Sequence, residues 1–444
     1  GRGHGLADRA LRKGKDLGRR DRHPVSETIE PWLERLAGKG PVLVLAPHGG
    51  RRKRAAAAGD RVNDLHTAEI ARELAARLGA AALINHGLDR NETDLNRISE
   101  LLDRGSGFLE PLLAMVEERV EGHGRALVLL VHGWNMALAA CDIGVGLRSD
   151  NGHNRGRYLT VGRDCLETTV AVLQNKLSGQ GLGATLGQRY PAAAANNATQ
   201  LFSGRHLEHT NGAVRRLASL GAEGRVDAIQ LELGIPLRWP GPRRQRFIDA
   251  AVAAVASYPV SSPPRARERA MATKANGPVE TKANRPVEKG HSLQLLIGGG
   301  HTALLFGVEA TGPASMSTRL CLLRTDGSMS LFVAEGPWEG RNGHYKIAGL
   351  VVEAAPAGGL VVDFEGPMIS YQSHDAFLDL ERGLASAGLE EARVSLRCDG
   401  GCDGFTEASG SISRDGHPLC HVSARAALGR GGGRMGRGRG LGTV

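Results

Sequence analysis

Two histidines and one glutamate stand where a buried sheet would present them to a ligand. His48 and His132 each follow an apolar run and precede a glycine, and Glu232 lies inside a third apolar run. In open α/β sheets, ligands bind beyond the carboxyl ends of the strands. Two strand-end histidines and a nearby carboxylate are the groups that a mononuclear zinc hydrolase needs. The sequence therefore predicts a hydrolytic metal site.

A catalytic zinc keeps three protein ligands and one open position. His48 and His132 are the predicted nitrogen ligands, and Asp64 is the best candidate for the third, with His66 close to it in sequence. Each histidine could instead be structural. Asp64 could instead cap the helix that follows it, because a carboxylate there satisfies free backbone N–H groups.

Glu232 is the predicted general base, which would take a proton from the attacking water and pass it to the leaving amine. An unpaired charge inside an apolar strand is costly. The alternative is therefore a buried ion pair, for example with Arg238 or Arg90.

A dense polar cluster, Arg90, Asp94, Asn96 and Arg97, follows a short apolar run. Arginine recognises carboxylates through a fork of N–H donors. These residues could therefore bind a substrate that carries carboxylates. The alternative is a loop held together by its own Asp–Arg pairs.

The elements that would carry these residues alternate between strands and helices. Apolar positions at helical spacing predict a helix over 67–78, with Gly79 as its C-terminal stop. Over residues 39–258 the alternation predicts a mixed, largely parallel sheet with helices on both faces. A basic leader, 1–38, precedes it and contains a short helix near 25–36.

The second half of the chain has a different pattern. The eight-residue stretch 273–280 recurs with one change as 281–288, which predicts an extended Pro-containing linker over 259–290. Short alternating runs with Asp-Gly and Asn-Gly turns over 291–427 predict an antiparallel all-β sandwich or barrel, with one helix at 375–387. The Arg/Gly-rich end, 428–444, is predicted to be disordered.

Composition limits the environment and the partners. The 444 residues carry a formal net charge of +9, but basic residues are concentrated in 2–22, 51–54 and 425–439. The Arg/Gly tail lacks interleaved aromatic residues, so nucleic-acid binding is not expected. No apolar run reaches about 18 residues, so no membrane span is expected. Six cysteines in a chain of this size favour a reducing cytoplasm over a disulfide framework. Oligomeric state is left open.

Several motifs, in this order and spacing, resemble the N-formylglutamate amidohydrolase family over about residues 40–256. They are Pro47-His48-Gly49-Gly50, Asn63-Asp64-Leu65-His66, the loop from Leu88 to Arg97, Leu130-Val131-His132-Gly133, Phe202-Ser203-Gly204-Arg205 and Ile229-Gln230-Leu231-Glu232. The family is similar to the zinc carboxypeptidases in fold. The chain departs from its pattern at Leu130 and Gly133, where the family usually has aspartate and serine.

The resemblance implies zinc as cofactor, held by His48, Asp64 and His132, with Glu232 as the catalytic carboxylate. It implies Arg90, Asn96 and Arg97 on the substrate side, where we also expect Asp94 and Arg205. The type reaction converts N-formylglutamate to glutamate and formate, so a small N-acyl amino acid is the expected partner. The alternatives are a metallopeptidase or peptide amidase of the same fold, or a non-catalytic binding protein with a degenerate metal site.

Overall fold

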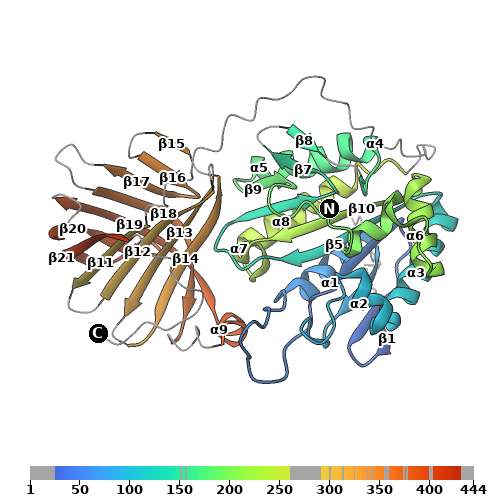
Figure 1. Ribbon diagram of the computed structural model, residues 1–444, viewed down its shortest axis with the longest axis horizontal. Coiled ribbons are helices and arrows are strands. Elements are labelled where there is room, and N and C mark those ends of the chain that lie inside the picture. The colour runs from blue at the N-terminus through green and yellow to red at the C-terminus, as the bar shows by residue number, and fades with distance from the viewer. Residues whose placement is uncertain are drawn as a thin grey trace, which may run out of the picture.

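The computed structural model describes residues 26–150, 153–155, 158–260, 292–299, 302–312, 315–324, 326–337, 339–341, 344–354, 360–373, 376, 379–399 and 404–431. These residues form an α/β unit followed by an antiparallel β unit (Figure 1), which confirms the predicted fold class. The predicted leader up to residue 25, the linker from 261 and the tail from 432 lie outside the described residues.

The α/β unit is built on an eight-stranded mixed sheet of order β1-β2-β4-β3-β5-β10-β6-β9. Its central strands β4, β3, β5 and β10 are parallel, whereas β2 and β6 run antiparallel to their neighbours β4 and β10. The bounds are β1 Ser26–Glu30, β2 Leu33–Leu36, β3 Val42–Ala46, β4 Ala81–Asn85, β5 Ala126–Gly133, β6 Ala140–Gly144, β9 Gly183–Leu186 and β10 Val226–Leu233. A separate hairpin joins β7 Arg148–Asp150 to β8 His153–Arg155.

Helices cover both faces of this sheet. Successive side chains of a strand point to opposite sides, so a strand of apolar residues gives both faces a surface to be buried. Val44 packs in one core with α1, α5 and α8, whereas its neighbour Leu43 packs in another with α2, α3 and α6. The helices are α1 Thr67–Leu78, α2 Ile98–Asp103, α3 Ser106–His123, α4 Arg163–Cys165, the π-helix η1 Leu166–Val170, α5 Ala171–Gly179, the 3₁₀ helices η2 Ala198–Phe202 and η3 Gly204–His206, α6 Gly212–Ala222, α7 Ile235–Arg238 and α8 Pro242–Val255.

The beginning of the described chain corrects one prediction. Residues 26–36 are not helical; they form β1 and β2, which pair antiparallel, and β2 then pairs with β4. Leu33 and Leu36 are buried and lie three residues apart, a spacing that also fits a helix. Pairing with β4 decides between the two, so the α/β sheet extends into the segment assigned to the leader.

The β unit is an antiparallel sheet that closes on itself through an additional pairing of β14 with β18. This is the barrel form of the two predicted alternatives. The ring consists of β11 Ser292–Gly299, β12 Thr302–Gly312, β13 Ser315–Arg324, β14 Met329–Pro337, β18 Leu360–Tyr371, β19 Gly388–Asp399, β20 Gly404–Arg414 and β21 His417–Gly431. Strands β15 Glu339–Arg341, β16 His344–Ile347 and β17 Leu350–Ala354 extend from β18, and α9 spans Leu380–Ala385.

The ends of β20 and β21 confirm one predicted turn and correct one boundary. Asp415 and Gly416 join the two strands with positive φ angles of 48° and 81°, as a two-residue Asp-Gly hairpin requires. Strand β21 continues to Gly431 and pairs with β11. Residues 428–431, which were assigned to the disordered tail, therefore belong to the sheet.

The two units share an apolar cluster. Leu65, Ile235 and Trp239 of the α/β unit pack with the core of the β unit. The Ala137 N–H donates to the Val333 carbonyl at 3.0 Å, and Trp239 Nε1 donates to the Ala387 carbonyl at 2.9 Å. The β unit therefore meets the loops that follow β3, β5 and β10, at the carboxyl edge of the central strands.

Across the part of the chain that the structure describes, no helix combines the length and the hydropathy that a membrane span requires.

Candidate metal centre

The parallel strands bring the predicted histidines and glutamate to one edge of the sheet. His48 lies two residues beyond the end of β3, and His132 lies near the end of the adjacent β5. Glu232 on β10 is the direct register partner of His132. The sequence separations are large, but the strand order places all three side chains in one neighbourhood.

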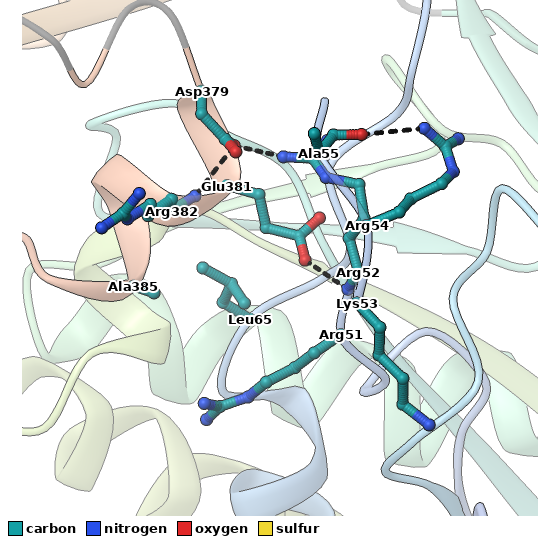
Figure 2. Close-up of a pocket in the computed structure, with 10 residues that line it drawn as sticks. All are labelled: Arg51, Arg52, Lys53, Arg54, Ala55, Leu65, Asp379, Glu381, Arg382 and Ala385. Atoms are coloured by element: carbon teal, nitrogen blue, oxygen red, sulfur yellow. Dashed lines mark hydrogen bonds and ion pairs between the residues drawn. The ribbon is translucent and has the colours of Figure 1, made fainter. Parts of the chain in front are cut away.

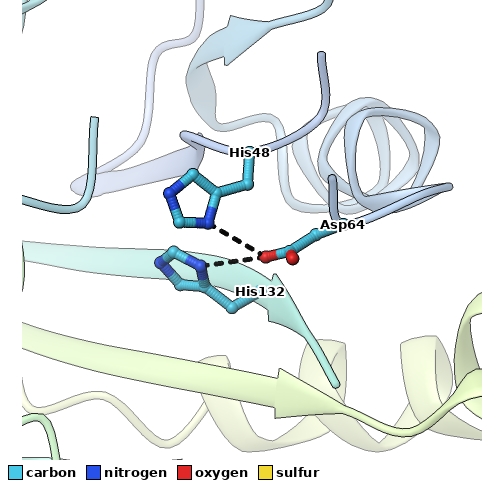
Figure 3. Close-up of side chains that lie close together, drawn as sticks. All are labelled: His48, Asp64 and His132. Atoms are coloured by element: carbon cyan, nitrogen blue, oxygen red, sulfur yellow. Dashed lines mark hydrogen bonds and ion pairs between the residues drawn. The ribbon is translucent and has the colours of Figure 1, made fainter. Parts of the chain in front are cut away.

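His48, Asp64 and His132 form a compact buried cluster (Figure 3). One ligand atom from each lies within 4.8 Å of the others, and the residues are only 1%, 3% and 1% exposed. Asp64 Oδ2 lies 3.2 Å from Nδ1 of both His48 and His132. A tetrahedral zinc, with bonds of about 2.0–2.2 Å, separates its ligand atoms by about 3.3–3.5 Å. The donor types suit zinc, and the two Asp64–histidine separations match this value, whereas the 4.8 Å limit of the whole cluster is wider.

The second nitrogen of His132 is also informative. His132 Nε2 is buried and has no hydrogen-bond partner among the described residues. Burial, only partly offset by the hydrogen bond to Asp64, lowers the pKa of His132. The ring therefore stays neutral, which is the form of imidazole that binds metals.

Asp64 faces the site and does not cap α1 with its carboxylate. At the N-terminus of α1 it is the backbone carbonyl of Asp64 that accepts hydrogen bonds, from the Thr67 N–H at 3.2 Å and from Thr67 Oγ1 at 2.6 Å. His66 takes a left-handed conformation with φ 69°, and its ring packs edge-on against Trp239, 4.7 Å between centroids. The structure thus brings Asp64, and not His66, into the cluster.

His48 has a second carboxylate on its far side. Its Nε2 lies 2.6 Å from Asp94 Oδ1, while its Nδ1 faces Asp64. Burial and the charge of Arg90 oppose protonation, but the two carboxylates outweigh them, so the pKa of His48 is raised. Metal-ligating histidines commonly pair their other nitrogen with a carboxylate that fixes the ring. In this site Asp94 is the carboxylate that pairs with the second nitrogen of His48.

Glu232 is buried, 6% exposed, and is oriented by an amide. Gln230 Nε2 donates to Glu232 Oε1 at 2.8 Å, and Gln230 Oε1 accepts from Asn197 Nδ2 at 3.0 Å and Thr199 Oγ1 at 2.9 Å. Among the described residues, no cationic group lies within 4 Å of this carboxylate. Arg238 instead donates to the Leu65 and Trp134 carbonyls at 3.0 and 2.9 Å. The predicted alternative of a direct ion pair is therefore wrong.

Burial and the nearby charge of Asp64 raise the pKa of Glu232 to about 8. The folded, metal-free protein then retains a proton that the unfolded chain loses at its usual pKa of 4.5. Stability should therefore fall as pH rises from about 5 to 8. Glu232→Gln cannot ionise, so its stability should fall less steeply over this window. Urea unfolding in chelator at several pH values measures the difference.

Surface residue Glu208 supplies the control for this pH series. Glu208→Gln should follow the wild-type slope, because that side chain is exposed. A Glu232→Gln slope equal to that of the wild type would contradict the raised pKa.

Three arginines surround the carboxylate of Asp94. Arg61 Nη1 lies 2.7 Å, Arg97 Nε 3.2 Å and Arg90 Nη2 3.9 Å from Asp94 Oδ2. Arg90 also donates to Asp64 Oδ1 at 3.0 Å. The loop is thus held together by its own Asp–Arg pairs, as the alternative to substrate binding predicts. The same pairs place three guanidinium groups beside the cluster.

Two other predicted substrate residues lie in different surroundings. The Asn96 N–H donates to Asp94 Oδ1 at 3.1 Å, and Asn96 Oδ1 is buried without a partner in the described regions. Arg205 donates to the Ala193 carbonyl at 2.8 Å and lies over the Tyr158 ring. Its contacts are with the segment around 190 and not with the histidine cluster.

A steric contact explains why position 133 is a glycine. A Cβ at this position would lie 2.5 Å from Cζ and Nη1 of Arg238, whose side chain is fully buried. The Gly133 N–H also donates to Asp64 Oδ2 at 3.1 Å. The serine that the resembling family usually has here would meet the same guanidinium.

We therefore expect Gly133→Ala to lower the free energy of unfolding by about 1–3 kcal/mol through overpacking. The hydrogen bonds that hold Arg238 prevent an easy rearrangement. Gly122→Ala, on an exposed part of α3 where a Cβ would meet nothing within 4 Å, should leave stability unchanged or slightly raised. Urea unfolding compares the two, and equal effects would exclude the steric explanation.

Some members of the site were missed from sequence. No sequence pattern sets Arg61 apart from the arginines of the basic run at 51–54, which lies a few residues earlier. Gln230 carried a usable signal, because residues i and i+2 of a strand share a face and Gln230 therefore lies beside Glu232. The role of Asp94 beside His48 depends on how its loop folds back, and no local pattern predicts that.

Comparisons with known proteins give distant similarities. No protein-family model matches the chain, and no curated protein sequence matches it. The structure is similar to that of an N-formylglutamate amidohydrolase from Ralstonia eutropha JMP134, at 15% identity and a TM-score of 0.33, over 51% of this chain and 98% of that one. It is also similar to gene product Atu2144 from Agrobacterium tumefaciens, at 14% identity and a TM-score of 0.34, over 52% and 95% of the two chains. Functional inference therefore depends on the geometry of the site.

Proposed function

We propose that the protein is a zinc-dependent hydrolase that cleaves the amide bond of an N-formyl or N-acyl amino acid. One observation carries the proposal: two histidine Nδ1 atoms converge on Asp64 Oδ2 beside a buried carboxylate on the adjacent strand. A structural histidine has no need of this combination of buried donors and base.

His48, Asp64 and His132 would hold the metal. When bound, zinc supplies a Lewis acid that polarises a carbonyl and lowers the pKa of water toward about 7. His48 must give up a proton to become a ligand, and Asp94 then accepts the hydrogen bond from the opposite nitrogen and fixes the ring.

Glu232 would handle the protons of the reaction. Gln230 binds Oε1, so the proton taken from water goes to Oε2. The water oxygen forms the new bond to the acyl carbon as the C–N bond breaks, and Glu232 returns the proton to the departing nitrogen. The products are a carboxylic acid, formate in the simplest case, and a free amino acid.

The arginines favour an acidic substrate. Arg61 and Arg97 are partly exposed, with side-chain exposures of 47% and 42%, and both contact Asp94. Arg90 is shared between Asp64 and Asp94. Guanidinium groups that are solvent-accessible on one side and anchored on the other can bind a carboxylate from solvent. An N-acyl derivative of an acidic amino acid fits this arrangement.

Metal analysis followed by substrate comparison tests the proposal. The purified protein should contain about one zinc per chain, or take it up on titration, and should release formate from N-formylglutamate. A panel of N-acyl amino acids and short peptides defines the acyl group and distinguishes a peptidase. If the protein did not bind zinc, the hydrolase proposal would be wrong. If it bound zinc but cleaved only peptides, the proposed substrate class would be wrong.

A further inference from the structure

We propose that Glu381, on α9 of the β unit, is a positioning residue that holds the loop between two of the metal ligands. The inference rests on the metal site proposed above, because it assigns the β unit a part in shaping that site. Figure 2 shows Glu381 pointing from α9 to the backbone of the loop at Arg52.

The loop in question comprises residues 49–63 and begins and ends at ligands. His48 precedes it and Asp64 follows it, and the Asp64 N–H donates to the His48 carbonyl at 2.9 Å. Both ends of the loop are therefore covalently joined to ligands, and the two ends are hydrogen-bonded to each other. Its fixed points decide how accurately the two ligands face each other.

A single carboxylate joins both arms of this loop. Glu381 Oε1 accepts from the Arg52 N–H at 2.7 Å, and Oε2 accepts from the Asn63 N–H at 3.0 Å and from Asn63 Nδ2 at 3.1 Å. Glu381 lies 318 residues from Asn63 in sequence. The contact can form only when the two units are docked.

The environment of Glu381 makes these hydrogen bonds important. Its residue is only 6% exposed, and no cationic group among the described residues comes within 4 Å of its carboxylate. The Arg52 guanidinium pairs instead with Asp379 and approaches Asp60 at 3.7 Å. A buried charge is costly unless hydrogen bonds satisfy it, so the backbone donors of the loop and the carboxylate stabilise each other.

The contact continues to the metal site through Asn63. Asn63 is fully buried, and its Oδ1 accepts from the Arg90 N–H at 3.0 Å. Arg90 in turn donates to Asp64 Oδ1 at 3.0 Å. A continuous hydrogen-bonded path thus connects Glu381 of the β unit to the proposed ligand Asp64.

Close packing does not replace this connection. A cavity of about 440 Å³ lies between the loop and α9, and its lining includes the basic residues Arg51, Arg52, Lys53 and Arg54. Two of these basic residues, Arg52 and Arg54, form ion pairs with Asp379 and Asp60, and side chains around a cavity lose packing contacts. Glu381 therefore acts beside the Arg52–Asp379 ion pair, and it binds backbone N–H groups in both arms of the loop.

Glu381→Gln tests the inference. The carboxamide keeps the shape, but its NH₂ group would face an N–H donor from either Arg52 or Asn63. We expect zinc affinity, measured by competition with a chelator, to fall about 10–100-fold, as for other residues that orient ligands. Amide hydrogen exchange over residues 51–63 should become faster. These readouts do not depend on turnover.

Glu391→Gln is the matched control. Glu391 also joins the units, through Arg243, but the pair is solvent-exposed and distant in sequence from the loop. It should leave zinc affinity and loop exchange at wild-type values. Equal losses in both variants would mean general undocking of the β unit and would overturn the specific role of Glu381, as would a folded Glu381→Gln protein with unchanged affinity and exchange.

A measurement on the wild-type protein covers a variant that does not fold. The Arg52 and Asn63 amides should exchange more slowly than that of the exposed Lys53 between them, and equal rates would overturn the inference. This exchange readout is independent of zinc. If no zinc bound to any variant, the proposed function would fail, and the loop restraint would still be tested.

Discussion

His132→Ala should lower zinc affinity by more than about 100-fold, a larger loss than for residues that only orient ligands. Its Nδ1 lies 3.2 Å from Asp64 Oδ2, and its ring centroid is 4.8 Å from that of His48. Alanine removes one of three donors, and no other histidine of the described chain lies in the cluster. Chelator competition and metal content after dialysis measure the loss. His48→Ala should behave similarly.

His66→Ala is the control for the loss of an imidazole close to the site, and this imidazole is half-buried. His66 follows Asp64 closely but packs on Trp239, outside the cluster. It should keep zinc affinity near the wild-type value, although it can lower stability. Thermal unfolding in chelator separates destabilisation from metal loss. If His132→Ala bound zinc as tightly as the wild type does, His132 would be removed from the set of metal ligands, and the departures at Leu130 and Gly133 would mark a histidine that no longer binds the metal.

Sequence periodicity predicted the strands that carry the site because they are buried on both faces. Strand β3 is a continuous apolar run, β5 is one up to His132, β10 carries Asp227, Gln230 and Glu232 among apolar residues, and α1 begins and ends where its spacing predicts. Strand β6 was missed although all five of its residues are buried, because it is short and Asp142 lies at its centre, so no apolar run of strand length remains. Backbone N–H groups of Arg189 and Tyr190 satisfy that carboxylate at 2.8 and 2.6 Å. Such compensation comes from tertiary structure.

The candidate site was likewise predicted from sequence only in part. Residues at the ends of neighbouring parallel strands must converge, so His48, His132 and Glu232 could be grouped from sequence. Loop contacts depend on how each loop folds back over that edge. Arg238 illustrates this: it was a predicted partner of Glu232, yet it donates to backbone carbonyls. Glu381 reaches the site from the other unit, beyond any local pattern.

Glu232→Gln should retain zinc but lower kcat by about 100- to 10,000-fold, the usual contribution of a general base. Glutamine is nearly isosteric and can still accept from Gln230 Nε2, so the surrounding network of Asn197 and Thr199 is preserved. It cannot accept a proton at neutral pH. Steady-state release of the acyl product, compared with zinc content per chain, measures the two effects separately.

The pH profile distinguishes a base from a merely structural carboxylate. A base acts when deprotonated, so wild-type kcat should rise with pH through the pKa of Glu232, which burial raises to about 8 in the absence of metal. A nearby cation favours the carboxylate and shifts this limb to lower pH. Glu232→Gln should lose the limb along with the rate, whereas Glu208→Gln should retain both. A Glu232→Gln enzyme with a reduced rate but an unchanged acidic limb would assign that limb to another group and remove Glu232 from proton transfer.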